Sequence, residues 1–397
     1  MLLRPEAVAL LAFLLLLLLL PHSFAFQSIH ITKKGSPVNK GTCMKSIGDD
    51  YENYDDDGEA FKDFFVSRQL YFDGEKPEAG FRLATLNFVR QVTTIFSQLL
   101  ETLRLKEKDP YELPDCLGLT LSNEDVKDAE YKRENSGGKV DAHPVSRTLY
   151  DVGCLLLDNL FDERPIQRFW FLEIIARIPY FSYVSMLHLY ESLGWWRACE
   201  LRRVHNAEEW NELHHLLIME SLGGNKLWSD RFLGYHVAIL YYWSLVTVYF
   251  FSPRIAYQFM ELLEAHAVDT YSTFVKENQS ALQKLPPPPI ARSYYKTGDL
   301  YFFDDFQQRP PGSRRPLCET LYDVFKNISE DEAEHVKTMK ACQDYAKIGV
   351  KVQSPHVARE DKELEDVAGK ETRRRMWKEW SAEVNLRGDR KVDGQRN

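Results

Sequence analysis

Six side chains in this 397-residue chain have the types and spacing of ligands for two metal ions. Glu212 and His215 form one Glu-x-x-His pair, and Glu332 and His335 form a second. Residues i and i+3 project from the same face of a helix, so each pair can bind one ion. The full set adds one lone glutamate ahead of each pair and comprises Glu173, Glu212, His215, Glu264, Glu332 and His335.

This combination predicts a di-metal carboxylate site. Two Glu-x-x-His pairs and two further glutamates, each on its own helix, are the ligand set of di-iron and di-manganese bundles. Four carboxylates and two imidazoles suit two iron or manganese ions better than zinc or copper. A single pair would carry little weight in a chain with 11 His, but two pairs with partner glutamates rarely arise by chance. We therefore predict a centre of two iron ions.

The neighbours of the lone glutamate Glu173 support this interpretation. It stands in the apolar run Phe171–Ile175, where a carboxylate is costly unless it is paired or bound to metal. Tyr271 follows Glu264 by seven residues, two helical turns, and is either a one-electron relay beside the metals or a buried structural tyrosine. Asn211 and Asp331 each precede a ligand glutamate and are candidates to orient the imidazoles.

The ligands need long helices to position them, and the sequence provides these. Helical patterns without strand signals make the fold class all-α, and we predict a ferritin-like four-helix di-iron bundle with two additional membrane-facing helices. Five such patterns span 166–193, 201–222, 232–251, 256–275 and 317–345. The segment Leu285–Pro289 interrupts the last two and is not expected to be helical. His188 and His236 stand in apolar runs and are expected to be structural.

The run 232–251 raises the question of membrane attachment. It is long enough to cross the hydrocarbon layer, at about 1.5 Å per residue. It also contains His236 and several tyrosines, and the ligand-bearing helices need covering neighbours. A helix lying in one leaflet of the membrane surface fits this better than a lone span, and it predicts a lipid-soluble substrate.

The chain ends and composition define the remaining organisation. Val8–Leu20 behind Arg4 resembles the apolar core of a signal peptide, and the Ser- and Lys-rich segment after it resembles a transit peptide. We divide the chain into a signal peptide (1–25), a transit-like and acidic leader (26–60), a helical or linker region (61–140), a di-iron domain (141–348) and a charged tail (349–397). A net charge of -9 argues against nucleic acid, and the six scattered cysteines are expected to be ordinary thiols.

Four motifs on these helices resemble those of the alternative oxidase family. They cover about 147–343, half of the chain, and include all six ligand candidates. The motifs are Glu163–Phe181, Trp210–Leu216, Leu263–Ala267 and Asp331–His335. The resemblance implies a membrane-surface enzyme that oxidises quinol and reduces oxygen to water without pumping protons, and it leaves a homodimer open.

Within that family the chain is similar to the plastid branch. The insert Leu285–Phe306, the run Glu220–Asn225 and the two-part leader all point there, so the resemblance implies plastoquinol as substrate and the thylakoid membrane as location. His266 stands where the mitochondrial branch has a glutamate, which disfavours ubiquinol. The family's quinol pocket corresponds here to Arg147, Asp151, Arg168, Leu172 and Thr270, with Tyr271 at its inner end.

Three alternatives remain at this stage. A mitochondrial-type ubiquinol oxidase would use the same residues, but the insert and leader disfavour it. An acyl desaturase or hydroxylase would use the same metal set with an acyl tunnel and a surface for an electron donor. An iron-storage or purely structural bundle would need no substrate pocket at all.

Overall fold

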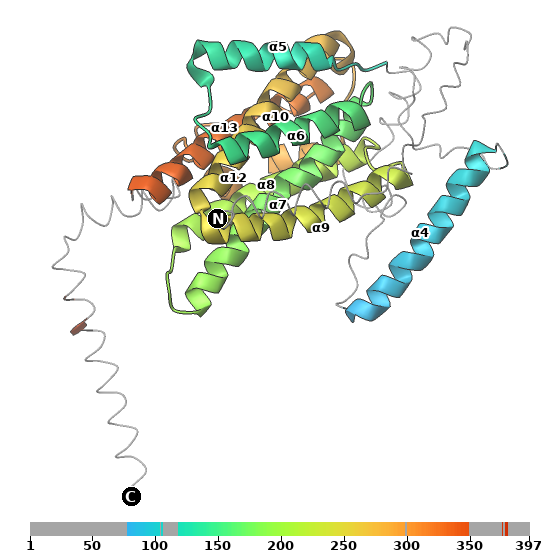
Figure 1. Cartoon of the computed structure of the whole chain (residues 1–397). Helices are drawn as coiled ribbons and strands as arrows, with labels where there is room; N and C mark the ends of the chain where they lie inside the picture. Colours follow the sequence, from blue (N-terminus) through green and yellow to red (C-terminus); the bar gives the residue numbers. More distant parts are fainter. Residues whose placement is uncertain are drawn as a thin grey trace, which may run out of the picture.

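The computed structural model describes residues 78–103, 105, 118–297, 300–348, 375, 378 and 379. Within these residues the chain is helical and contains no strand, which confirms the all-α prediction. The helices of the main body pack side by side, and α4 (Gly80–Thr102) lies at its edge (Figure 1). The predicted leader and most of the charged tail lie outside the described residues.

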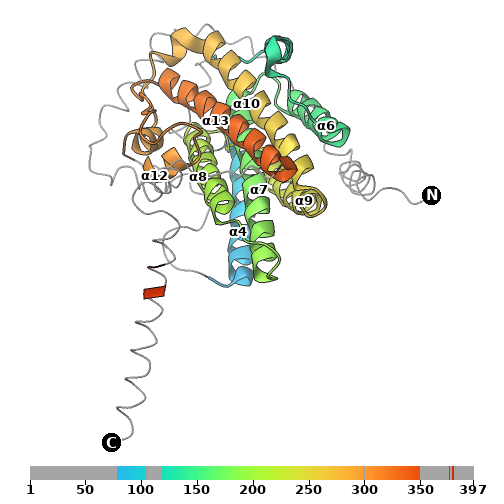
Figure 2. The same ribbon diagram turned by 90° about the vertical axis from the view of Figure 1, so that its left-hand side faces the viewer.

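Four long helices form the centre of the body. These are α7 (Pro165–Ser192), α8 (Cys199–Ser221), α10 (Pro253–Leu282) and α13 (Leu321–Ile348). Helix α7 packs along α8 and α10 packs along α13, so the body is a bundle built from two helix pairs (Figure 2). The sequence predicted all four helices. The structure extends α10 to Leu282, beyond the predicted end at 275, and begins α13 at Leu321 rather than 317.

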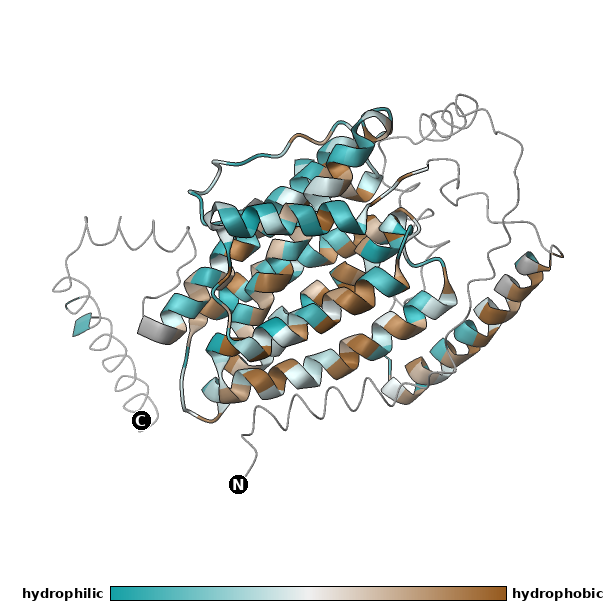
Figure 3. Cartoon of the chain, turned by 45° about the horizontal axis from the view of Figure 1, so that its top comes forward, coloured by the Kyte–Doolittle hydropathy of each residue, from teal (hydrophilic) through white to brown (hydrophobic). Residues whose placement is uncertain are grey.

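Helix α9 (Trp228–Phe251) covers α7, and α6 (Pro144–Leu160) covers α10. Among the described residues, α9 alone is long and apolar enough to cross a membrane, and only 28% of its most apolar 18-residue window is buried. Large apolar side chains are exposed on both helices and include Leu155, Leu160, Ile239, Trp243, Phe250 and Phe251. Figure 3 colours the ribbon by hydropathy, with hydrophobic residues in brown. The hydrophobic pattern of the sequence predicted the apolar helix α9 but did not predict the shorter helix α6.

A further helix, α5 (Asn123–Arg133), lies against α10. Its start is capped by Ser122, whose side chain accepts a hydrogen bond from the Asp125 backbone. At its other end, Arg133 pairs with Asp269 at 2.9 Å. The packed body therefore begins about twenty residues before the Asp141 boundary that the sequence suggested.

The insert between α10 and α13 contains more helix than the sequence indicated. Helix α11 (Pro289–Arg292), the π-helical turn η4 (Ser293–Thr297) and α12 (Leu300–Asp305) follow one another. The expectation that Leu285–Pro289 excludes helix was wrong at its last residue, because proline is tolerated at the first position of a helix, where no N–H donor is needed. The insert lies against α8 and places the side chains of η4 beside the bundle centre.

Candidate metal centre

The six predicted ligand side chains converge inside the four-helix bundle. Glu173 comes from α7, Glu212 and His215 from α8, Glu264 from α10, and Glu332 and His335 from α13. They form two groups whose ligand atoms all lie within 4.8 Å of one another, and two glutamates belong to both groups. The first group is Glu173, Glu212, His215 and Glu332, and the second is Glu212, Glu264, Glu332 and His335.

The sharing of two glutamates follows from the antiparallel helix packing. His215 Nδ1 lies 3.1 Å from Glu332 Oε1, and His335 Nδ1 lies 2.8 Å from Glu212 Oε1. Each imidazole therefore faces the carboxylate of the opposite Glu-x-x-His pair as well as its own. Glu212 and Glu332 therefore lie between the two histidines, within reach of both ligand groups.

Burial and unsatisfied atoms show that the residues fit metal ions. All six side chains are at most 2% exposed. Several of their polar atoms have no hydrogen-bond partner among the described residues: Glu173 Oε2, both Glu212 oxygens, His215 Nδ1, Glu332 Oε2 and both His335 nitrogens. Buried polar atoms without partners are rare and costly, and seven of them lie together in this one cluster. Two divalent cations would satisfy these atoms and neutralise the four carboxylates.

Electrostatics in the metal-free cluster lead to the same conclusion. Burial, together with the Glu212 and Glu332 carboxylates, raises the pKa values of Glu173 and Glu264 well above their ordinary range. Burial opposes ionisation of Glu212 as well, but His215 and His335 outweigh it and lower its pKa. Without a metal, the cluster must therefore retain protons. A bound cation would take their place, since metal binding to such ligands releases protons.

Asp331 contacts the Nε2 side of the His215 imidazole, away from the metal cluster. Its position next to the ligand candidate Glu332 had suggested such a contact. Its Oδ2 lies 3.0 Å from His215 Nε2 and also accepts hydrogen bonds from Asn211 and Tyr295. Arg314, on the loop before α13, donates to the other carboxylate oxygen. Burial would raise the pKa of Asp331, but Arg314 and His215 outweigh burial and hold it at about 2. The carboxylate fixes the imidazole with Nδ1 directed at the cluster.

We expect Asp331→Asn to destabilise the metal-free protein by about 3 kcal/mol, because the Arg314 guanidinium would remain buried without its counter-charge. The Arg314 side chain is only 5% exposed. Denaturant unfolding of the variant measures the loss. The double variant Asp331→Leu with Arg314→Met is the control and should recover part of it, and equal stability of wild type and Asp331→Asn would contradict the structural role of this pair.

His335 lacks such a partner, so the two imidazoles are not equivalent. Its Nε2 has no hydrogen-bond partner among the described residues, and the Phe306 ring lies 5.1 Å away, centroid to centroid. On the same side, the Tyr180 hydroxyl donates to Glu264 Oε1 at 2.7 Å. Sequence reasoning missed Tyr180, although it follows Glu173 by seven residues on α7, the spacing at which Tyr271 follows Glu264. Arg314 and Tyr295 lie outside the ligand-bearing helices, so no helical spacing from a ligand marks them.

Tyr271 is fully buried and reaches the cluster from α10. Its hydroxyl donates to Glu173 Oε1, whereas the sequence had placed it on the face of Glu264. Its ring stacks on Phe169 with centroids 4.2 Å apart and planes 10° apart. The tyrosine is therefore held rigidly, and its only hydrogen bond in the described structure is to a ligand candidate of the first group.

Beside Tyr271 lies a second buried polar group, centred on His266. Arg168 Nη2 is 3.5 Å from His266 Nε2, and the Tyr150 hydroxyl is 3.2 Å from His266 Nδ1. Burial, reinforced by the Arg168 charge, lowers the pKa of His266 to about 3, so the imidazole is neutral. Thr270 is one turn further along α10 and donates to the His266 carbonyl.

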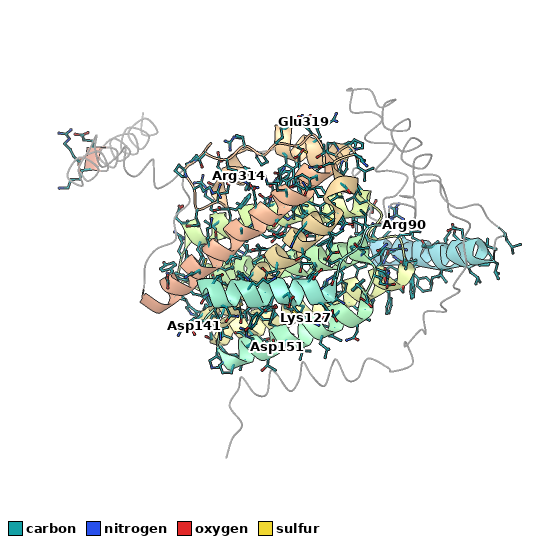
Figure 4. The ribbon with its side chains drawn as sticks, turned by 90° about the horizontal axis from the view of Figure 1, so that it is seen from above. Arg90, Lys127, Asp141, Asp151, Arg314 and Glu319 are labelled. Atoms are coloured by element: carbon teal, nitrogen blue, oxygen red, sulfur yellow. The ribbon has the colours of Figure 1, made fainter. Side chains whose placement is uncertain are left out.

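The structure separates the five predicted quinol residues into two sets. Arg168 and Thr270 are fully buried and Leu172 nearly so, all close to the bundle centre. Arg147 lies further out on α6 and pairs with Glu134 at 2.6 Å. Asp151 is exposed on the same helix and lies at the edge of the body in Figure 4, far from Arg314. Outside this region, His188 and His236 are exposed and contact none of the six ligand candidates.

Comparisons with known proteins agree with this geometry. The model of the family described as "Alternative oxidase" matches residues 123–344, more than half of the chain. Ubiquinol oxidase 4, chloroplastic/chromoplastic, from Arabidopsis thaliana is 52% identical over 226 residues, which cover 57% of this chain and 63% of the relative. A mitochondrial ubiquinol oxidase from Mangifera indica is 30% identical over 185 residues, 45% of this chain and 50% of the relative.

The chain thus spans less than two thirds of the length of these relatives. It is markedly more similar to the chloroplastic protein than to the mitochondrial ones, which include one from Glycine max at 29% identity. This confirms the resemblance to the plastid branch that the motifs predicted. With the family match across every helix that contributes to the metal centre, we conclude that the chain belongs to the alternative oxidase family.

Proposed function

We propose that this protein is a non-haem di-iron plastoquinol oxidase that converts two quinols and one oxygen molecule into two quinones and two waters. The observation that carries the proposal is the buried convergence of two Glu-x-x-His pairs and two glutamates in a bundle of this family. The first relative's name describes a ubiquinol oxidase of chloroplasts and chromoplasts, which supports the reaction class. Reduction of oxygen to water needs four electrons, so two quinols are oxidised in each cycle.

The six converging side chains would hold the two ions, and Glu212 and Glu332 belong to both ligand groups. Carboxylate oxygens and imidazole nitrogens are the donors that iron takes in bundles of this kind. Two iron ions would supply the reversible one-electron steps that oxygen reduction requires. The protein's own part is to hold the ligands, to exclude water through burial, and to keep the Tyr271 phenol proton at Glu173 Oε1.

The proposed quinol site lies between α7 and α10. Arg168 and Thr270 would position the quinol head, and Leu172 would pack on its ring. Arg168 is 1% exposed and is held by Asp158 at 3.1 Å and by Asn123. Its Nε has no hydrogen-bond partner among the described residues, which leaves a buried donor for a quinol oxygen. Tyr271 lies one residue beyond Thr270 and joins this site to the metal centre.

We expect His266→Glu to shift substrate preference several-fold from plastoquinol towards ubiquinol. A carboxylate at this position would form an ion pair with Arg168, whose Nη2 is 3.5 Å from the present neutral imidazole, and would withdraw that guanidinium from the quinol head. The ratio of kcat/KM for the two quinols measures the shift. His266→Gln, which keeps a neutral hydrogen-bonding side chain, is the control, and an unchanged ratio in His266→Glu would show that this residue does not select the quinol.

Attachment to one leaflet of a membrane surface fits the exposed apolar side chains of α6 and α9. These helices lie outside the four ligand-bearing ones, and α9 would present Trp243, Phe250 and Phe251 to lipid. Tryptophan and phenylalanine on one face of such a helix are typical of interfacial binding. A quinol would then enter sideways from the lipid.

A plastid location follows from similarity to the chloroplastic relative and from the predicted signal and transit segments. The thylakoid membrane is the proposed site, because plastoquinol resides there. A homodimer is compatible with this assignment, and no nucleic-acid partner is expected.

Oxygen uptake by the iron-loaded protein with a decyl-plastoquinol analogue tests the proposal. We expect uptake with two quinols oxidised for each oxygen consumed, and slower uptake with a decyl-ubiquinol analogue. An acyl desaturase or a storage bundle would show uptake with neither quinol. Absence of uptake with both quinols, in protein that contains two irons per chain, would rule out the oxidase assignment.

A further inference from the structure

A line of aromatic rings runs from the metal centre to the surface on the side away from Tyr271. Successive ring centroids are 6.4, 4.9, 5.5, 6.4 and 6.0 Å apart. The rings, in order, are those of Tyr180, Tyr183, Tyr257, Tyr249, Tyr190 and Trp195. Rings at such separations are in or near van der Waals contact, so electrons can pass between neighbours without a gap in the line.

The two ends of the line have different environments. Tyr180 is fully buried and its hydroxyl donates to Glu264 Oε1, a proposed metal ligand. Trp195 follows the end of α7 and is 62% exposed, so its indole meets solvent. Tyr271 belongs to neither end: its ring contacts are with Phe169 and Phe325, and it meets Glu173 instead.

A buried acid–base pair serves the middle of the line, and the quinol reaction leaves it without a role. His205 and Glu208 are both fully buried, and His205 Nδ1 lies 2.8 Å from Glu208 Oε2. With the proton on Nδ1 and donated to the Glu208 carboxylate, His205 Nε2 accepts from the Tyr257 hydroxyl at 3.1 Å. The Tyr257 oxygen can then accept from Tyr249, whose hydroxyl is 2.9 Å away.

Each tyrosine that must hold an oxidised state therefore has a place for its proton. Tyr180 can release its proton to Glu264 Oε1, and Tyr257 can release its proton to His205 Nε2. The proton of Tyr249 can follow through the Tyr257 hydroxyl to the same imidazole. Tyr183 donates only to the Ala256 carbonyl, which is no base, so it serves as a bridge between the rings on either side.

We propose that this line, the tyrosine path, conducts single electrons from a reductant in solution to the metal centre when quinol is lacking. This rests on the proposed oxidase function, because that reaction supplies the oxidant. An oxygen-derived oxidising equivalent that finds no quinol would otherwise attack the ligands. The tyrosine path would move this oxidising equivalent to the protein surface, where a reductant in solution can reduce it.

The electron and proton balance closes at every residue. Tyr180 would give up one electron towards the metal centre while its proton moves along its hydrogen bond to Glu264 Oε1, and the proton would return when an electron arrives from Tyr257 across the Tyr183 ring. Tyr257 and Tyr249 use His205 in the same way. Tyr190 is half-buried and Trp195 exposed, so both exchange protons with water. A thiolate or ascorbate-class reductant then restores Trp195, and the net change is one electron transferred inwards.

The first test maps oxidative damage. The iron-loaded full chain is chemically reduced, exposed to oxygen without quinol, and digested for mass spectrometry. Trp196 is the internal control, since it is adjacent, 41% exposed, and in ring contact with Tyr345 rather than with the path. We expect the ratio of oxidised Trp195 to oxidised Trp196 to be several-fold higher than in metal-free protein treated identically.

The variant Tyr190→Phe should return that ratio to the metal-free value. Its hydroxyl makes no hydrogen bond to any described residue, so the change interrupts the path with little effect on packing. Quinol-dependent oxygen uptake should be unaffected. A ratio that stays high in Tyr190→Phe, or one that never exceeds the metal-free value in active enzyme, would overturn the path.

The second test needs no metal, so it remains decisive if the oxidase assignment fails. Azide radicals generated by pulse radiolysis oxidise exposed tryptophans of the metal-free chain, and transient absorption follows the transfer from tryptophan radical to tyrosine radical. We expect a fast first-order phase in wild type that both Trp195→Phe and Tyr190→Phe remove. A fast phase with the same amplitude in both variants would show that the rings are only core packing.

Discussion

Glu212→Ala is expected to lose both metal ions together with all quinol-dependent oxygen uptake. Glu212 belongs to both ligand groups, and its two carboxylate oxygens have no other hydrogen-bond partner among the described residues. Without it, each group keeps only three of its four ligand side chains, and the three remaining carboxylates no longer balance the charge of two divalent cations. Iron analysis of the purified variant against wild type measures the loss, which should be complete rather than partial.

Two comparisons make this result specific. Glu173 belongs to the first group only, so Glu173→Ala should retain about one ion per chain, in the group that contains His335. Glu220→Gln, on the same helix as Glu212, alters a side chain that accepts from Trp170 and lies outside both groups, so it should retain both ions. If Glu212→Ala kept two irons and full activity, Glu212 would not be a ligand.

The second large effect is expected for Tyr271→Phe, which should lower kcat by a factor on the order of 100 while leaving the iron content at two per chain. The phenol follows Thr270 of the proposed quinol site on α10 and contacts Glu173 of the first ligand group. Under the proposed function its removal would delete a one-electron relay, and it leaves Glu173 Oε1 without this hydrogen-bond donor. Stopped-flow quinol oxidation and iron analysis on the same sample separate the two effects.

Tyr241→Phe is the matched control for this experiment. Tyr241 is also buried, but its hydroxyl has no hydrogen-bond partner among the described residues, so its loss should change neither iron content nor rate. A rate for Tyr271→Phe within a factor of two or so of wild type would assign the tyrosine a structural role instead. Loss of iron in that variant would indicate that it acts by holding Glu173.

The spacing of side chains along a single helix was predictable from the sequence. The features that depend only on this spacing, such as which side chains share one helix face, were therefore predictable too. The i and i+3 geometry of Glu212 with His215 and of Glu332 with His335 is fixed by the helical backbone. The position of Asp331 beside a ligand made it a candidate partner, and it does contact His215. The all-α class was predictable because apolar residues recur at helical spacing along each long segment and because strand patterns are lacking.

Relations between helices were not predictable from spacing. The sequence placed Tyr271 by its offset from Glu264 on one helix, yet its hydroxyl meets Glu173 on another. Arg314 reaches Asp331 from a loop seventeen residues earlier, and no local pattern marks that contact. The position of α5 against α10 depends on pairs such as Arg133 with Asp269, which are separated by 136 residues.

The sequence by itself thus predicted which side chains converge as candidate metal ligands and which helices carry them, since residue type and backbone periodicity are local properties. Only the tertiary structure decided that Glu212 and Glu332 are shared between the groups and that the tyrosine path ends at Trp195. It also decided that His215 Nε2 faces Asp331, whereas His335 Nε2 has no hydrogen-bond partner among the described residues. These features depend on the packing of helices distant in sequence, where a displacement of an ångström or two would separate the groups.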